Sequence, residues 1–280
     1  MNTKQTIILM MLGATLTTAC VSEDHDLAPS ATPTAAKKGT LSVSLAADAS
    51  FDANTRALTE ANYRNTNNYT VQLVSAAAPA TPIVECLGSQ IAENMPKDLE
   101  IGSYEVRAFY GTESAASRND FRVEGSKTFT ISAGQTTSVR VDCAPTCGKI
   151  SVDFDAAMDT YYSDYSVTFG GTAALAANTI AWAKADSEPW YVKLGTTAET
   201  VAYTISLTAK SDYAITDAAG NKQTTGTATG TFQIERNKAQ KLTIKPNFVA
   251  PTEGAVSITI TIDDSTNDRP VTIEVPVNWV

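Results

Sequence analysis

The sequence contains a single histidine, His25, among its 280 residues. Nucleophilic hydrolases of the Ser-His-Asp and Cys-His types require a histidine as general base, and many zinc and iron sites use histidine ligands. His25 lies in a polar segment near the N-terminus that we expect to be a tether, so such sites are excluded from the folded part of the chain. Phosphate-binding glycine loops are also lacking, because the glycines stand in turns between expected strands. We therefore expect no enzymatic activity and no cofactor.

Long hydrophobic runs are absent too. The apolar stretch over residues 7–16 has about half of the roughly 20 residues that a membrane-spanning helix needs. It precedes Thr17-Thr18-Ala19-Cys20, as in a signal peptide with a small-residue cleavage site. The small residue before Cys20 resembles a bacterial lipobox, although Leu16 stands four residues before the cysteine rather than three. We predict a signal peptide over 1–19 and acylation of Cys20. The alternative is ordinary signal peptidase cleavage, which would release a soluble protein.

The segment after Cys20 reads as a tether over residues 20–38. Its acidic cluster, residues 23–26, resembles the signal that takes Bacteroidota lipoproteins to the outer face of the outer membrane. The alternative interpretation is a solvated linker. Residues 27–38 are rich in Pro, Ala, Ser and Thr, which cannot form a core. We expect a lipid-anchored protein of the outer membrane, exposed at the cell surface.

Basic residues and cysteines are both scarce. The chain has 21 Lys and Arg against 30 Asp and Glu, a net charge of −9, which argues against nucleic acid and anionic headgroups as partners. Beyond Cys20 only Cys86, Cys143 and Cys147 remain. One pair could form a disulfide in an oxidising compartment, with Cys143 and Cys147 the mild favourite, but the sequence leaves the pairing open. No metal site is predicted.

What the sequence does contain is an internal repeat. Three segments share an alternating pattern that begins with glycine: Gly39–Leu45, Gly148–Phe154 and Gly254–Ile260. A second alternating pattern, Asn68–Leu73, recurs at Asp164–Phe169. Alternation with a period of two predicts half-buried strands, and an offset of about one hundred residues between copies indicates a duplicated domain.

Each copy has short alternating segments separated by Gly, Asn, Asp and Pro clusters, which is typical of a Greek-key β-sandwich. We predict an all-β fold of tandem Greek-key sandwiches, immunoglobulin-like or transthyretin-like, over residues 39–146 and 147–280. Tyr104 follows Gly102 at an expected corner, where its ring would be buried and its hydroxyl would reach the backbone. Tyr203 stands at the equivalent position of the second copy.

The third copy is only a hairpin, with strands over residues 255–262 and 271–277 joined by the turn 263–268. Two strands alone are marginally stable. They either complete the second sandwich of their own chain or are donated to a neighbouring subunit, as in pilus assembly. The turn is rich in oxygen ligands but lacks the ligand spacing of a calcium loop, so a solvated turn is favoured. Ser265 in this turn matches a short O-glycosylation motif of Bacteroidota.

An ordered set of motifs resembles a domain-of-unknown-function family of Bacteroidota surface lipoproteins. These motifs are Gly39–Leu45, Thr55–Ala57, Asn68–Val71, Leu99–Val106, Gly125–Ile131, Val141–Cys143 and Ile150–Phe154. The resemblance covers nearly all of the mature chain. It implies an architecture like that of fimbrillin-type lipoproteins, which build pili or mediate adhesion.

The same resemblance draws attention to Arg56. Fimbrillin precursors are commonly cut after an arginine that follows the first strand, and Arg56 stands where such a cut would fall. Cleavage there would remove the lipid and the strand over 40–45, exposing an apolar groove. The favoured alternative is that Arg56 is a loop residue and that the lipid stays on.

Two further groups of side chains could carry a function. Trp182, Trp190 and Tyr191 would form a glycan-stacking platform if they faced solvent, although such residues more often belong to a core. Asp153 and Asp155 could in principle act as a carboxylate pair, but alternation directs both outward as surface acids.

The sequence thus predicts a non-enzymatic surface lipoprotein that acts in adhesion or as a fimbrillin-like, pilus-associated subunit. The alternative is a glycan-binding lipoprotein of a nutrient-uptake system. The expected partners are the outer membrane through the lipid, and a surface glycan, a surface protein or other pilin subunits. The ligand, the polymeric state and any exchange of the C-terminal hairpin are left open.

Overall fold

Period-two alternation organises nearly every regular element of this chain. The computed structural model describes residues 37–51, 60–216, 219–247, 257–264, 271–276 and 278–279. In these residues the inward positions of the strands are apolar and the outward ones polar, so each strand has one face for a core. The all-β fold class is confirmed.

The N-terminal copy contains eight strands and short helical turns. The strands are β1 (Lys38–Ala47), β2 (Thr70–Ser75), β3 (Ala78–Leu87), β4 (Asp98–Glu100), β5 (Gly102–Tyr110), β6 (Ala116–Ser117), β7 (Val123–Ile131) and β8 (Thr136–Pro145). The helical turns are α1 (Glu60–Arg64), η1 (Thr66–Asn68), η2 (Gly88–Gln90) and α2 (Ile91–Asn94). Seven of the strands are linked in the order β3-β2-β5-β7-β8-β1-β4.

The C-terminal copy repeats this plan and adds strands to it. Its strands are β9 (Cys147–Phe154), β10 (Tyr162–Gly170), β11 (Ile180–Ala183), β12 (Trp190–Lys193), β13 (Glu199–Ala209), β14 (Ile215–Thr216), β15 (Lys222–Gln223), β16 (Thr225–Ile234), β17 (Ala239–Asn247), β18 (Ser257–Asp264), β19 (Val271–Pro276) and β20 (Asn278–Trp279). Helical turns are α3 (Met158–Tyr161), η3 (Ala173–Leu175) and η4 (Ser211–Tyr213). One sheet runs β11-β10-β13-β16-β20, another β19-β18-β17-β9-β12-β6, and β14 pairs with β15.

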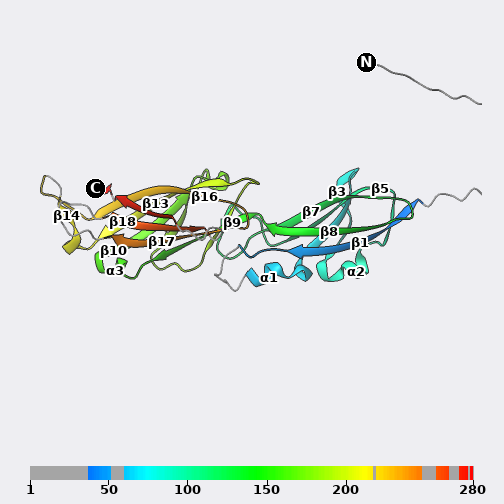
Figure 1. Ribbon diagram of the computed structural model, residues 1–280, viewed down its shortest axis with the longest axis horizontal. Coiled ribbons are helices and arrows are strands. Elements are labelled where there is room, and N and C mark those ends of the chain that lie inside the picture. The colour runs from blue at the N-terminus through cyan, green and yellow to red at the C-terminus, as the bar shows by residue number, and fades with distance from the viewer. Residues whose placement is uncertain are drawn as a thin grey trace, which may run out of the picture. The chain divides into compact units, whose positions relative to one another are not determined.

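Strand pairing bears out the internal repeat. β1 runs parallel to β8, with Thr40–Ala47 opposite Thr136–Cys143, although the two strands are far apart in sequence (Figure 1). β9 runs parallel to β17 in the same way. The antiparallel series β2-β5-β7 likewise corresponds to β10-β13-β16. Equivalent sequence segments therefore have equivalent partners.

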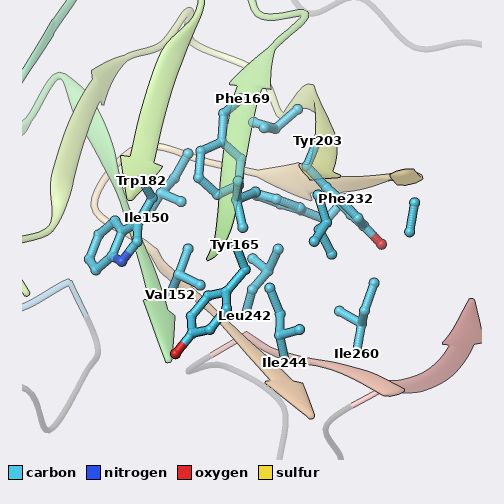
Figure 2. Close-up of a cluster of buried hydrophobic side chains, with 14 of the residues drawn as sticks. Ile150, Val152, Tyr165, Phe169, Trp182, Tyr203, Phe232, Leu242, Ile244 and Ile260 are labelled. Carbon is cyan, nitrogen blue, oxygen red and sulfur yellow. The ribbon is translucent and has the colours of Figure 1, made fainter. Parts of the chain in front are cut away.

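Each copy surrounds its own hydrophobic cluster. In the second cluster, side chains of β9, β10, β11, β17 and β18 converge, among them Ile150, Trp182, Leu242 and Ile260 (Figure 2). The first cluster is built on β1, β2, β5, β7 and β8, yet it also includes Tyr191 from the second copy. Packing therefore crosses the expected boundary between residues 146 and 147. The domain bounds 39–146 and 147–280 stay a prediction.

Two local predictions have clear outcomes. The buried Tyr104 donates its hydroxyl hydrogen to the carbonyl oxygen of Glu100 at 3.0 Å, as the corner position predicted. The favoured disulfide is wrong, because Cys86, Cys143 and Cys147 are all free and buried. Cys143 and Cys147 lie in a largely extended segment, where four residues span about 13 Å, well beyond the roughly 7 Å limit between bridged Cα atoms.

Candidate binding site

The predicted site residues fall into two groups. Cys20, Arg56 and Ser265 lie outside the described residues. Trp182, Trp190 and Tyr191 lie within them, on β11 and β12.

The predicted aromatic platform is not formed. Trp182 and Tyr191 are only 1% and 2% exposed, so these two rings are core residues, which is the more common position for such side chains. The cause is alternation: Trp182 shares the inward face of β11 with Ile180, and its ring lies beside Ile150 and Val152 (Figure 2). Trp190 is half-buried and donates its Nε1 hydrogen to the Ala181 carbonyl oxygen at 2.9 Å.

An arginine from the first copy occupies the space that a ligand would need. The guanidinium carbon of Arg118 lies 4.4 Å from the ring centroid of Trp190 and 5.0 Å from that of Trp182. Arg118 also donates to the Ala181 carbonyl at 3.0 Å, to the Glu188 carbonyl, and to the Asp186 carboxylate at 2.6 Å. The tryptophan pair therefore receives Arg118, and sequence reasoning missed this residue because the contact joins positions more than 60 residues apart.

Short strand pairing accompanies this contact. Ser117 and Ala116 of β6 lie opposite Tyr191 and Val192 of β12. β12 pairs on its other side with β9. Residues 116–118 thus join the first copy to the second through backbone and side chain together.

A hollow of about 590 Å³ lies beside Trp182 on the second copy. Its lining includes Trp182, Phe154 and Tyr165 together with acids and lysines. Asp153 Oδ2 lies 3.0 Å from Lys241 Nζ.

A second acid of the lining, Asp159, is held ionised. Asp159 Oδ1 lies 2.5 Å from Lys184 Nζ and accepts a hydrogen bond from the Tyr165 hydroxyl at 2.9 Å. The hydrogen bond from Lys184 holds the pKa of Asp159 below its usual range. Burial, together with the neighbouring Asp159, raises the pKa of Tyr165 to about 12. Asp159 is therefore unsuited to donate a proton at neutral pH, and the site fits binding better than acid catalysis.

The chemistry of this hollow suits a ligand with many hydroxyls. Carboxylates accept hydrogen bonds from such groups, lysines donate to them, and aromatic floors cover the apolar faces of sugar rings. Sequence alternation identified Asp153 as an outward-facing acid. It could not identify Lys184 or Asp159 as neighbours, because they lie on different elements.

Other kinds of site are not seen in the part of the chain that the structure describes. It holds no helix long and apolar enough to cross a membrane. Within the same residues, no three His, Cys, Asp or Glu side chains gather closely enough to hold a metal ion.

The fold and the hollow define a duplicated all-β protein with a polar surface site and no recognisable catalytic constellation among its described residues. The chain belongs to the family described as Domain of unknown function (DUF4493), whose model matches residues 37–277.

Several solved structures from Parabacteroides and Bacteroides species are similar to this chain. A fimbrial assembly protein from Parabacteroides distasonis is 11% identical, with 85% of this chain and 99% of that one covered, at a TM-score of 0.42. A "putative cell adhesion protein" from Bacteroides eggerthii is 12% identical, with 82% and 96% covered, also at 0.42. Proteins from Bacteroides thetaiotaomicron described as "putative polysaccharide binding proteins" are 12% identical, with 81% and 98% covered, at 0.35. No curated protein matches the chain.

Proposed function

We propose that this chain is a non-enzymatic surface lipoprotein, anchored through Cys20 to the outer membrane, that acts in adhesion as a fimbrillin-like structural subunit. The observation that carries the proposal is a difference between the two copies at equivalent strand edges. In the second copy, the C-terminal strand β18 covers the edge of β17. Within the described residues of the first copy, the equivalent edge of β8 is paired only at Ala144 and Pro145.

The C-terminal strands of the second copy pair with β17 and with β16. β18 pairs with β17 along its whole length, from Gln240 opposite Asp264 to Asn247 opposite Ser257. β20 pairs with β16 at Gly226 and Thr227. Ile258 and Ile260 of β18 are fully buried in the second core, so the C-terminal strands complete that core.

The equivalent strands of the first copy are β8 and β7. They pair with each other only at Val123 and Glu124 of β7, opposite Pro145 and Ala144. Along the rest of both edges, no further strand pairs among residues 37–51 and 60–145. An unpaired edge presents backbone groups that another chain can bind by adding a strand. This asymmetry supports assembly between subunits at the first copy.

The test uses full-length protein in outer-membrane fractions, run unboiled on denaturing gels. We expect ladders of high molecular weight, and loss of membrane attachment in Cys20→Ser. If assembly requires cleavage, Arg56→Ala abolishes the ladder, whereas Arg64→Ala, an exposed arginine on the nearby α1, leaves it intact. A monomer under every condition would contradict the proposal.

A second candidate function, glycan binding in a nutrient-uptake system, is favoured by the hollow beside Trp182. Its test is retention of the protein on polysaccharide gels. Asp153→Ala or Lys184→Ala should release the protein, while Asp142→Ala, an exposed acid of the first copy, should not. Equal retention of all three variants would count against this site.

A further inference from the structure

A buried pair of opposite charges joins the two copies. Glu60 begins α1 and Lys149 lies on β9, and the Nζ atom of Lys149 is 2.7 Å from Oε1 of Glu60. The two side chains are 3% and 2% exposed. Every other ion pair found in the described residues has at least one partner that is 20% exposed or more, so this pair is set apart by its burial.

The surroundings of the pair are aromatic. The hydroxyl of the buried Tyr191 donates a hydrogen bond to the same Oε1 atom of Glu60 at 2.9 Å. The ring centroid of Phe51 lies 6.0 Å from Lys149 Nζ, and Phe51 packs on Tyr191 and Phe121. Charges in such a place carry a large desolvation cost. Condensation of the two groups to an amide would remove both charges.

We propose that Lys149 and Glu60 become joined by an intramolecular amide bond. The Nζ atom of Lys149 bonds to the Cδ atom of Glu60, and the bond from Cδ to the carboxyl oxygen that departs is broken. That oxygen leaves as water with two of the three protons of the Lys149 ammonium, and the third proton stays on the amide nitrogen. The hydrogen bond from Tyr191 to Oε1 stabilises the negative charge that develops on the retained oxygen as the nitrogen attacks. The step is a dehydration, so it needs no oxidant or reductant, and its atoms and charges balance.

Three features of the site favour this product. The reacting nitrogen and the carboxyl are already in contact, which replaces an encounter between two groups with a reaction inside one pocket. The amide carries no net charge, so it removes the cost of burying an ion pair. Tyr191 keeps its acceptor, because the amide oxygen takes the place of the carboxylate oxygen.

The consequence is a covalent link between segments 89 residues apart. α1 belongs to the first copy, whereas β9 is the first strand of the second. A bond between them would hold the two copies together even where the noncovalent contacts of the junction opened.

The decisive measurement is peptide mapping of the purified full chain by mass spectrometry, which reports on this bond whatever happens to the N-terminus. We expect a branched peptide that contains both Glu60 and Lys149, one water lighter than the sum of its parts, with no tryptic cleavage at Lys149. If only the linear peptides at their full masses are found, the proposal is overturned.

Variants give an independent check. Lys149→Arg keeps the positive charge and the length but its guanidinium does not condense, so only linear peptides are expected. Lys241→Arg, at the exposed pair with Asp153, should leave the branched peptide unchanged. Tyr191→Phe should slow its appearance after synthesis by about a hundredfold or more, the loss expected for one oxyanion donor. Branched peptide that persists in Lys149→Arg would show that the bond lies elsewhere and would overturn the assignment.

Discussion

Arg118, a loop residue at the junction between the copies, makes several kinds of interaction at once. Its guanidinium contacts two indole rings and donates to two backbone carbonyls and one carboxylate. The Arg118 side chain is only 20% exposed, so its cation–π contacts and charged hydrogen bonds are weakly screened. A single side chain thus accounts for much of the contact between the copies.

We expect Arg118→Ala to lower the free energy of unfolding by about 2–4 kcal/mol, from lost cation–π contacts and charge-assisted hydrogen bonds. Urea unfolding followed by tryptophan fluorescence measures this, because Trp182 and Trp190 lie against the guanidinium. Arg140→Ala is the matched control. Arg140 pairs with Asp142, but both side chains are about 70% exposed, and the loss should stay below about 0.5 kcal/mol. Equal effects of the two substitutions would contradict the importance assigned to Arg118.

Residues differ in how far the sequence reveals their roles. Tyr104 was predictable because its bond to Glu100 spans four residues and follows from the corner motif. Arg118 and Glu60 were not, since their partners lie far along the chain and no local pattern marks them. Lys149 occupies an outward position in the alternation of β9, and it is buried by packing against residues distant in sequence, Glu60 of α1 and Phe51.

At the scale of elements, the glycine that opens each repeat has a steric reason. A Cβ atom on Gly39 would overlap the Ser132 carbonyl oxygen and come within 2.9 Å of that of Gln135. At Gly148 the added atom would meet Ile234 and Leu194. The first strand of the N-terminal copy therefore needs glycine at its start, because backbone oxygens lie against it, whereas at Gly148 the close atoms belong to side chains.

Gly39→Ala should destabilise the protein by about 1–3 kcal/mol, the usual cost of inserting a methyl group where the backbone must move. Gly170→Ala serves as its control, because the nearest atom to the added methyl is Thr179 Cγ2 at 3.4 Å, an ordinary contact. Thermal unfolding of both variants gives the comparison. A Gly39→Ala protein that melts with the parent would show that β1 has room to shift.

The sequence predicted the long strands well and the short ones poorly. Apolar and polar residues alternate clearly in β1, β2, β9 and β10, because each of these strands buries one face. β12 has four residues, which pair with β9, and β6 has two residues, which pair with β12 across the junction, so both strands depend on partners rather than on any pattern of their own. The disulfide prediction failed for a related reason: the spacing of Cys143 and Cys147 in the sequence does not reveal the path of the chain between them.

Across the whole molecule, buried tyrosines and thiols make stability depend on alkaline pH. Burial raises the pKa of Tyr162 from 10.0 to about 12, and burial with the nearby Asp142 raises that of Cys143 from 9.0 to about 12. The unfolded chain loses these protons at lower pH than the folded one. Between about pH 9 and pH 12 the unfolded state binds fewer protons, so stability is full below pH 9 and falls as pH rises.

We expect the urea midpoint to decline steadily over this range. Tyr162→Phe should flatten the decline above pH 10 by up to about 1.4 kcal/mol per pH unit, the effect of one proton. At neutral pH the same variant should be as stable as the parent or slightly more so, because the Tyr162 hydroxyl is buried without a hydrogen-bond partner among the described residues. A midpoint that stays level to pH 12, or a Tyr162→Phe protein with an unchanged slope, would contradict this account.

The parallel pairing of β1 with β8 determines how the first copy carries a pulling force. The polypeptide enters β1 at Lys38 and leaves β8 at Pro145, and the two strands run parallel. Tension applied between these points slides one strand along the other and loads their hydrogen bonds together, so that they cannot open one after another. The same geometry recurs where β9 meets β17. A protein built this way resists being stretched along its strands far better than being peeled across them.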